Sequence, residues 1–295
     1  MAESIQEILK NVRRVQITAR RTVNDLLAGQ YRSVFRGQGM EFDEVREYQP
    51  GDEIRTIDWN VTARAGTPFI KRYSEERELT VLFVVDVSAS GIFGSGSRSR
   101  LDVIVELAAV LMFSALRNND RVGLLTFAGE VEAWFPPRKG KSNVLRLLRE
   151  LLSVTPVKSG TNIDQALKTI NTVQRRKAVV FLMSDFLDQI SRSTLVATHG
   201  RHDLVSICVQ DPREHQLPES GLLNLQDAET GQIIQLDAGS AKVRQKFADQ
   251  ARHRQEQLKS QLQQAGVDLL EIDLAESYTA ALQRFFTMRE RRQRG

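Results

Sequence analysis

Five short apolar runs, separated by helical patterns, constrain the fold of this chain more than any other feature. The runs lie at 79–85, 121–127, 178–183, 203–209 and 267–272. Continuous apolar runs of this length suit strands that are buried on both faces of a parallel sheet. Helical patterns lie between them and after them, at 101–117, 142–152, 164–173, 241–264 and 277–295. The alternation predicts an α/β fold with an open, mostly parallel sheet and helices on both faces.

The pattern changes along the chain and predicts three parts. Residues 1–30 form an N-terminal amphipathic helix, because apolar side chains recur at helical spacing over 3–28 and Gly29 follows. Residues 31–78 lose this periodicity and form a small, irregular, Arg/Asp-rich subdomain that contains short strands. Residues 79–295 form the α/β domain, with a β-hairpin insertion near 222–236 and a turn at Pro136–Pro137.

Composition narrows the class and the compartment. The chain is 41% hydrophobic and 26% charged, which is typical of a soluble globular protein. The single cysteine, Cys208, cannot form an internal disulfide, and we expect it to be a buried, inert thiol. No apolar segment reaches the roughly 18 residues of a membrane span, and the first residues lack the apolar stretch of a signal peptide. We therefore expect no membrane span and a cytoplasmic location.

The positive net charge lies at the two ends of the chain. Residues 1–32 carry six basic and three acidic side chains, and 284–295 carry five arginines and one glutamate. We expect two solvated helix faces, with docking to an acidic protein surface as the alternative. We expect no nucleic-acid partner, because no strand or aromatic pattern for base readout accompanies the basic residues.

Oxygen-bearing side chains gather where three predicted strands or loops end. Asp86, Ser88 and Ser90 follow the first apolar run, Thr161 precedes the helix near Asp164, and Asp185 follows the third run. Ligand sites of open α/β sheets lie at the carboxyl ends of the strands. Carboxylates and hydroxyls without sulfur or imidazole suit Mg²⁺ best, with Mn²⁺ or Ca²⁺ as alternatives. A turn and helix cap is the structural alternative for the same residues.

The D-x-S-x-S sequence, the later threonine and the later aspartate resemble the metal-ion-dependent adhesion site (MIDAS) of von Willebrand factor type A domains. The resemblance implies a von Willebrand A-like fold. It also implies that Asp86, Ser88, Ser90, Thr161 and Asp185 hold a divalent cation, with some carboxylates acting through water. In that family, an acidic side chain of a protein partner completes the coordination of the ion. Ser184, beside Asp185, is expected to satisfy backbone groups near the site.

The segment before the first strand resembles a second signature. Its motifs are G-x-G-x-E-F at 37–42, R-E-Y at 46–48, G-D at 51–52 and R-x-I-D-W at 55–59, followed by S-D-F at 184–186 and D-P-R-E at 211–214. Together they are similar to the DUF58 (domain of unknown function 58) family. That resemblance implies a protein partner, either a MoxR-type AAA+ ATPase or its client, and a role in assembly or maturation of protein complexes.

Two functions of different classes follow from these residues. The preferred one is a non-catalytic, divalent-metal-dependent protein-binding module. The alternative is a Mg²⁺-dependent, phosphatase-like hydrolase that uses the same ion as a Lewis acid. For the Arg/Asp-rich segment, a structural ion-pair network is preferred over an enzyme site built on Glu41, Asp52 or Asp58.

Overall fold

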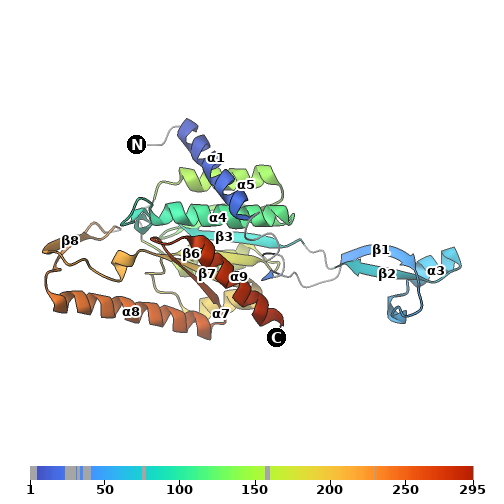
Figure 1. Ribbon diagram of the computed structural model, residues 1–295. Helices are drawn as coiled ribbons and strands as arrows, with labels where there is room; N and C mark the ends of the chain where they lie inside the picture. Colours follow the sequence, from blue (N-terminus) through green and yellow to red (C-terminus); the bar gives the residue numbers. More distant parts are fainter. Residues whose placement is uncertain are drawn as a thin grey trace. The chain divides into compact units, whose positions relative to one another are not determined.

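The computed structural model describes residues 5–23, 31, 34–35, 41–74, 78–156, 160–228 and 230–294. The chain divides into two compact units (Figure 1). One is Phe35–Leu79, called the signature unit below; the other, the α/β body, combines Met1–Val34 with Thr80–Gly295. The N-terminal helix α1 (Ile5–Thr22) therefore belongs to the α/β body, where it packs against α4 and α5.

A six-stranded sheet forms the centre of the α/β body, in the order β10-β7-β6-β3-β4-β5. Its strands are β3 (Thr80–Asp86), β4 (Arg121–Phe127), β5 (Val131–Arg138), β6 (Val179–Ser184), β7 (Asp203–Gln210) and β10 (Asp268–Asp273). All neighbours pair in parallel except β4 and β5. Every residue of β6 is buried, as expected for a strand covered on both faces. The predicted open, mostly parallel α/β sheet is confirmed.

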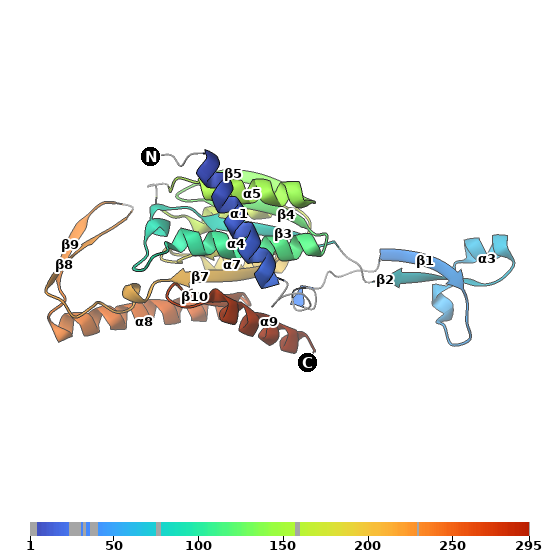
Figure 2. The same cartoon turned by 45° about the horizontal axis from the view of Figure 1, so that its top comes forward.

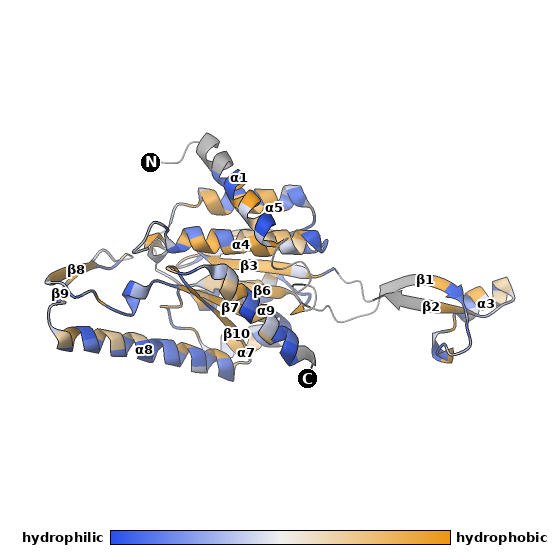
Figure 3. Ribbon diagram, viewed as in Figure 1, coloured by the Kyte–Doolittle hydropathy of each residue, from blue (hydrophilic) through white to orange (hydrophobic). Residues whose placement is uncertain are grey.

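Helices cover both faces of this sheet (Figures 1 and 2). The helices are α4 (Arg100–Arg117), α5 (Lys141–Ser153), α6 (Ile163–Val173), α7 (Arg192–Arg201), α8 (Ala241–Gln264) and α9 (Tyr278–Arg294). Helices α4, α5 and α1 contact one another on one face, whereas residues of α6, α7 and α8 share a core with the strands on the other. The strands and α4 carry most of the apolar residues, and α8 is largely polar along its length (Figure 3). Ser99 caps α4 together with Asp102, which fixes where that helix begins.

Two elements of the α/β body differ from the sequence prediction. The predicted turn at Pro136–Pro137 is wrong, because both prolines lie within β5, the edge strand. Proline is tolerated there because one side of an edge strand has no neighbour to which its backbone must donate. Helix α7 was not predicted; among its ten residues only Thr194, Leu195 and Thr198 are buried.

The basic C-terminal helix is not simply a solvated face. Arg289 is 8% exposed and pairs with Asp203 and Asp268 at 2.6 and 3.0 Å. Arg292 also pairs with Asp268, at 2.6 Å. These arginines fix α9 to the amino ends of β7 and β10, so the expectation of a solvated helix face is wrong for Arg289. Within the described residues, no helix combines the length and the apolar character that a membrane crossing requires.

The remaining elements are small. Strands β8 (Leu222–Gln226) and β9 (Ile233–Asp237) form an antiparallel hairpin, and η4 (Pro212–Glu214) is a single 3-10 turn after β7. The signature unit contains an antiparallel pair, β1 (Glu41–Glu47) and β2 (Phe69–Ser74). Between these strands lie the 3-10 turn η2 (Ile54–Thr56) and helix α3 (Trp59–Ala65).

Aspartates of the signature unit have structural roles. Asp58 caps α3 by accepting hydrogen bonds from the backbone of Asn60 and Val61, at 3.0 and 3.3 Å. Asp52 accepts from both Nη atoms of Arg46, at 2.9 and 2.7 Å. Both contacts agree with the preferred structural interpretation of this segment.

Candidate metal site at the carboxyl edge of the sheet

The candidate site begins at the end of β3. Asp86 is 4% exposed, and its Oδ1 accepts from the backbone N–H of Ser88 at 3.0 Å. Its Oδ2 accepts from the hydroxyl of Ser184, the last residue of the neighbouring strand β6, at 2.6 Å. The carboxylate is thus held by two donors from its own chain, and Ser184 contacts it directly instead of serving only backbone groups.

The two serines of the D-x-S-x-S sequence lie side by side after Asp86. The Oγ atoms of Ser88 and Ser90 are 3.0 Å apart. This is a hydrogen-bond distance, and it is also about the separation of two oxygens bound at right angles to Mg²⁺, each about 2.1 Å from the ion. Ser88 is 1% exposed and Ser90 is half-buried, so the pair opens toward solvent on the Ser90 side.

Thr161 lies on the loop before α6 and is half-buried. The backbone N–H of Asn162 donates to the carbonyl of Ala128, just after β4, at 2.8 Å. The N–H of Ile163 donates to Oδ2 of Asp188, just after β6, at 3.2 Å. These contacts fix the loop, and with it Thr161, to the carboxyl edge where Asp86 ends β3.

Asp185 follows β6, with its side chain 3% exposed. Its Oδ2 accepts from Nη1 of Arg100 at 2.8 Å, and its Oδ1 accepts from the backbone N–H of Leu187 at 3.1 Å. Phe186, between Asp185 and Leu187 in the sequence, has φ +57°, a left-handed conformation that is unusual for a bulky side chain. The strained turn and the two hydrogen bonds fix the orientation of this carboxylate.

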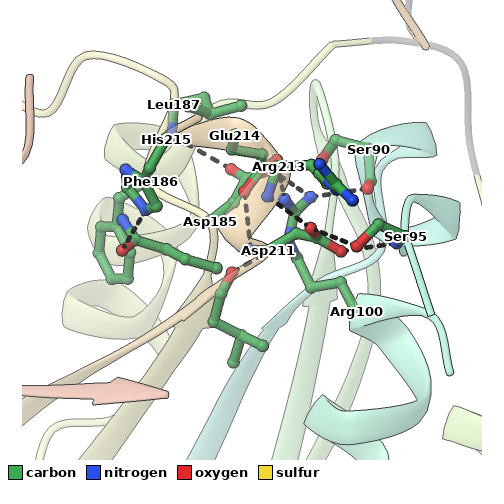
Figure 4. A network of polar contacts seen from close by, with 12 residues as sticks. Ser90, Ser95, Arg100, Asp185, Phe186, Leu187, Asp211, Arg213, Glu214 and His215 are labelled. Carbon is green, nitrogen blue, oxygen red and sulfur yellow. Dashed lines mark hydrogen bonds and ion pairs between the residues drawn. The ribbon is translucent and has the colours of Figure 1, made fainter. Parts of the chain in front are cut away.

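Arg100 connects the separate parts of the site (Figure 4). The same Nη1 that binds Asp185 donates to the backbone carbonyl of Ser90 at 2.7 Å, so Ser90 and Asp185 lie close together. Nε donates to the carbonyl of Val209 at 3.0 Å, and Nη2 pairs with Glu214 in η4. The guanidinium is held by four acceptors, and the residue is 1% exposed.

Burial and the crowding of charges change the proton affinity of groups at this edge. Burial, together with the charge of Asp185, raises the pKa of Asp86 from 3.8 to about 6, against the opposing hydrogen bonds from Ser184 and Ser88. Burial also raises the pKa of Cys208 far above its usual range, and its Sγ lies 3.6 Å from the carbonyl of Asp185. Cys208 is a buried, protonated thiol, as predicted.

The donor chemistry fits a hard divalent cation. Two carboxylates and the hydroxyls of Ser88, Ser90 and Thr161 all present oxygen, the ligand atom that Mg²⁺ prefers. In the part of the chain that the structure describes, no group of three or more His, Cys, Asp or Glu side chains is placed to hold a metal. A cation here would therefore depend on hydroxyl ligands and water as well as on carboxylates, and the five-residue metal set remains a prediction.

Sequence reasoning did not identify Arg100 or the role of the D-P-R-E segment. Asp211 accepts from the backbone and hydroxyl of Ser95 at 2.6 and 2.7 Å, and Glu214 pairs with Arg100. One signal was available, because Arg100 is the first residue of α4, where the helix dipole disfavours a cation. An arginine at that position indicates carboxylates nearby.

The surface around the site carries exposed apolar side chains. Ile92 and Phe93, just after Ser90, are 60% and 44% exposed, and Leu187, two residues after Asp185, is 58% exposed. Asp185 also lines a cleft of about 740 Å³, together with residues 186–190, Glu214, His215 and residues of α8. The candidate site therefore adjoins both an apolar rim and a polar cleft.

The α/β body carries oxygen-bearing side chains at the carboxyl edge of its sheet, and comparison with known proteins identifies the family. A family model described as "Protein of unknown function DUF58" matches residues 44–257. An uncharacterized protein of Mycobacterium tuberculosis is 31% identical over 283 residues, which is 95% of this chain and 89% of the relative. The chain belongs to the DUF58 family.

Two solved structures resemble this chain in fold at low sequence identity. The conserved hypothetical protein BatB from Bacteroides thetaiotaomicron has a TM-score of 0.42 and 16% identity, over 72% of this chain and 99% of that one. The VWA domain of SpRpn10 has a TM-score of 0.38 and 13% identity, over 72% of this chain and 95% of that one. The assignment to the family rests on the family model and the mycobacterial relative.

Proposed function

We propose that this protein is a non-catalytic module that binds a protein partner through a divalent cation, with Mg²⁺ preferred. Asp86, Ser88, Ser90 and Thr161 hold the ion at the carboxyl edge of the sheet, with Asp185 beside it. The ion supplies a positive charge and an open coordination position to which an acidic side chain of the partner binds. The residues of this chain orient the ion and shield one side of it from water.

The observation that carries this proposal is the placement of the two serine hydroxyls, 3.0 Å apart beside the buried carboxylate of Asp86. The apolar rim formed by Ile92, Phe93 and Leu187 supports a protein as the partner. Exposed apolar groups around a charged centre are typical of protein interfaces, in which an apolar surface excludes water from a polar contact.

The family resemblance supports a specific kind of partner. DUF58 proteins are associated with MoxR-type AAA+ ATPases, and we propose that this chain acts with such an ATPase, or with its client, in assembly or maturation of protein complexes. Co-purification with the ATPase in the presence of Mg²⁺, and its loss in the presence of EDTA, tests this part separately from metal binding.

Calorimetric titration with Mg²⁺, Mn²⁺ and Ca²⁺ tests the metal site. We expect one site in the wild type and loss of binding in Asp86→Ala and Ser88→Ala. Ser114→Ala is the matched control, since Ser114 is also 1% exposed but bonds to Val110 within α4. Equal binding by the wild type and Asp86→Ala contradicts the proposed site.

A Mg²⁺-dependent hydrolase remains the competing function, because a carboxyl with a pKa near 6 is suited to acid–base chemistry. Against it, the D-x-S-x-S sequence has no second aspartate to act as the acid–base group, as a D-x-D phosphatase would have. Assays with p-nitrophenyl phosphate and added metals separate the two functions. If the wild type hydrolyses the substrate and Asp86→Ala does not, the protein is a hydrolase and the proposal of a non-catalytic binding module is wrong.

A further inference from the structure

Arg100 and a divalent cation require the same carboxylate. Oδ2 of Asp185 accepts from Arg100 at 2.8 Å, while Oδ1 accepts from the N–H of Leu187 at 3.1 Å. A cation bound directly to Oδ2 would lie next to the guanidinium, and the two positive charges would repel each other in a region of low dielectric constant. Asp185 therefore cannot bind an ion directly through Oδ2 while it is paired with Arg100.

Arg100 is firmly held in this position. Its side chain is 2% exposed, and its donors are distributed over Asp185, Glu214 and the carbonyls of Ser90 and Val209. A buried guanidinium that leaves these four acceptors loses charge-assisted hydrogen bonds that water does not replace. The pairing of Asp185 with Arg100 is thus a fixed part of the site rather than one of several surface arrangements.

We propose that Arg100 is a positioning residue that keeps Asp185 from binding the cation directly and restricts it to contact through a water molecule. This inference rests on the proposed metal-dependent function and deepens it. With Asp185 held by Arg100, Asp86 is the one carboxylate of the five-residue set left to bind the ion directly. A bound divalent cation then keeps part of its charge, and an anionic group of the partner is favoured at its open position.

The number of water molecules on bound Mn²⁺ tests this assignment. Electron spin-echo measurements in deuterated water count these molecules for the metal alone. In Asp185→Asn we expect weaker Mn²⁺ binding and the same number of waters as in the wild type. One additional water in Asp185→Asn shows that Asp185 binds the ion directly and overturns the inference.

The second part of the experiment removes Arg100. In Arg100→Met, Asp185 is free to replace a water, so we expect one water fewer and Mn²⁺ affinity at least about tenfold higher. The double variant Arg100→Met/Asp185→Asn restores the wild-type number, since Arg100 acts through Asp185. An unchanged number of waters with weaker binding in folded Arg100→Met shows a merely structural role and contradicts the inference.

One control variant and one fallback keep the outcomes distinct. Arg46→Met removes an arginine of the same kind of pair in the signature unit, and we expect neither the affinity nor the number of waters to change. If Arg100→Met does not fold, Asp185→Asn decides the question alone. Absence of Mn²⁺ binding in the wild type overturns the proposed function together with this inference, whereas a changed number of waters in Asp185→Asn overturns this inference only.

Discussion

Arg100 and Arg46 each pair with an aspartate, but at very different depths. In the α/β body, the side chains of Arg100 and Asp185 are 2% and 3% exposed. In the signature unit, those of Arg46 and Asp52 are 34% and 19% exposed. The same two chemical groups therefore have different consequences, because a buried ion that loses its partner cannot be solvated, whereas an exposed one can.

The pairs also differ in the span of chain that they connect. Arg46 binds both oxygens of Asp52, six residues away, and Asp52 also accepts from the backbone of Gln49. Arg100 joins Ser90, Asp185, Val209 and Glu214, which come from four different segments. The exposed pair organises one turn, and the buried pair holds together one edge of the sheet.

The largest expected effect is that of Arg100→Met on stability. The substitution leaves Asp185 and Glu214 without their cation, and loss of one partner of a buried pair costs about 3–5 kcal/mol. Urea unfolding of the metal-free protein measures this change. If Arg100→Met lowers the free energy of unfolding by less than about 1 kcal/mol, the buried pair contributes no more to stability than an exposed pair does, and the two pairs do not differ as proposed.

The second prediction concerns Asp86, whose carboxylate accepts from Ser88 and Ser184 and pairs with no cation among the described residues. Its raised pKa means that the folded protein binds this proton more tightly than the unfolded chain does. The resulting stabilisation is complete below pH 3.8 and is lost as the pH rises to about 6. Above that pH, an ionised Asp86 costs up to about 3 kcal/mol in the metal-free protein, as the pKa shift implies.

Asp86→Asn removes this cost. An asparagine oxygen can still accept from Ser88, and its amide can donate to the hydroxyl of Ser184. In EDTA at pH 7.5 we therefore expect Asp86→Asn to be more stable than the wild type, with a smaller dependence on pH between 4 and 6. Added Mg²⁺ should stabilise the wild type alone. Parallel pH profiles of the two proteins would refute the assignment of this titration to Asp86.

Sequence patterns predict the core of this fold better than its edges. Strands such as β3 and β6 were recognisable because burial on both faces requires a continuous apolar run. Strand β5 was missed because its exposure alternates and it contains two prolines. Helix α7 was missed because so few of its residues are buried that no clear apolar stripe exists.

The candidate site shows the same division. Asp86, Ser88 and Ser90 could be found because they are close in the sequence and follow a buried strand. The role of Arg100 could not be found in this way, because its carboxylate partners are 85 and 114 residues distant. Among 41 basic residues, nothing but its position at the start of a helix distinguishes it.

A smaller effect is expected at Asp58, the buried N-cap of α3 in the signature unit. Asp58→Ala removes the acceptor for the N–H groups of Asn60 and Val61, which costs about 1 kcal/mol. Hydrogen exchange should become faster in residues 59–65 and stay unchanged in α4, whose cap is formed by Ser99 and Asp102. Uniform acceleration in both helices would contradict a local role for this cap.

The smallest effect is expected for Arg46→Met. Water can solvate the carboxylate that this change exposes, so the loss should be much smaller than that of Arg100→Met and decrease further as salt screens the pair. The pKa of Asp52, which the hydrogen bond from Arg46 and the N–H of Gln49 lower, should rise toward its usual value. NMR titration of the Asp52 carboxyl measures this shift, and urea unfolding at low and high salt measures the stability. A loss that equals that of Arg100→Met and ignores salt would mean that burial does not govern the difference between the two pairs.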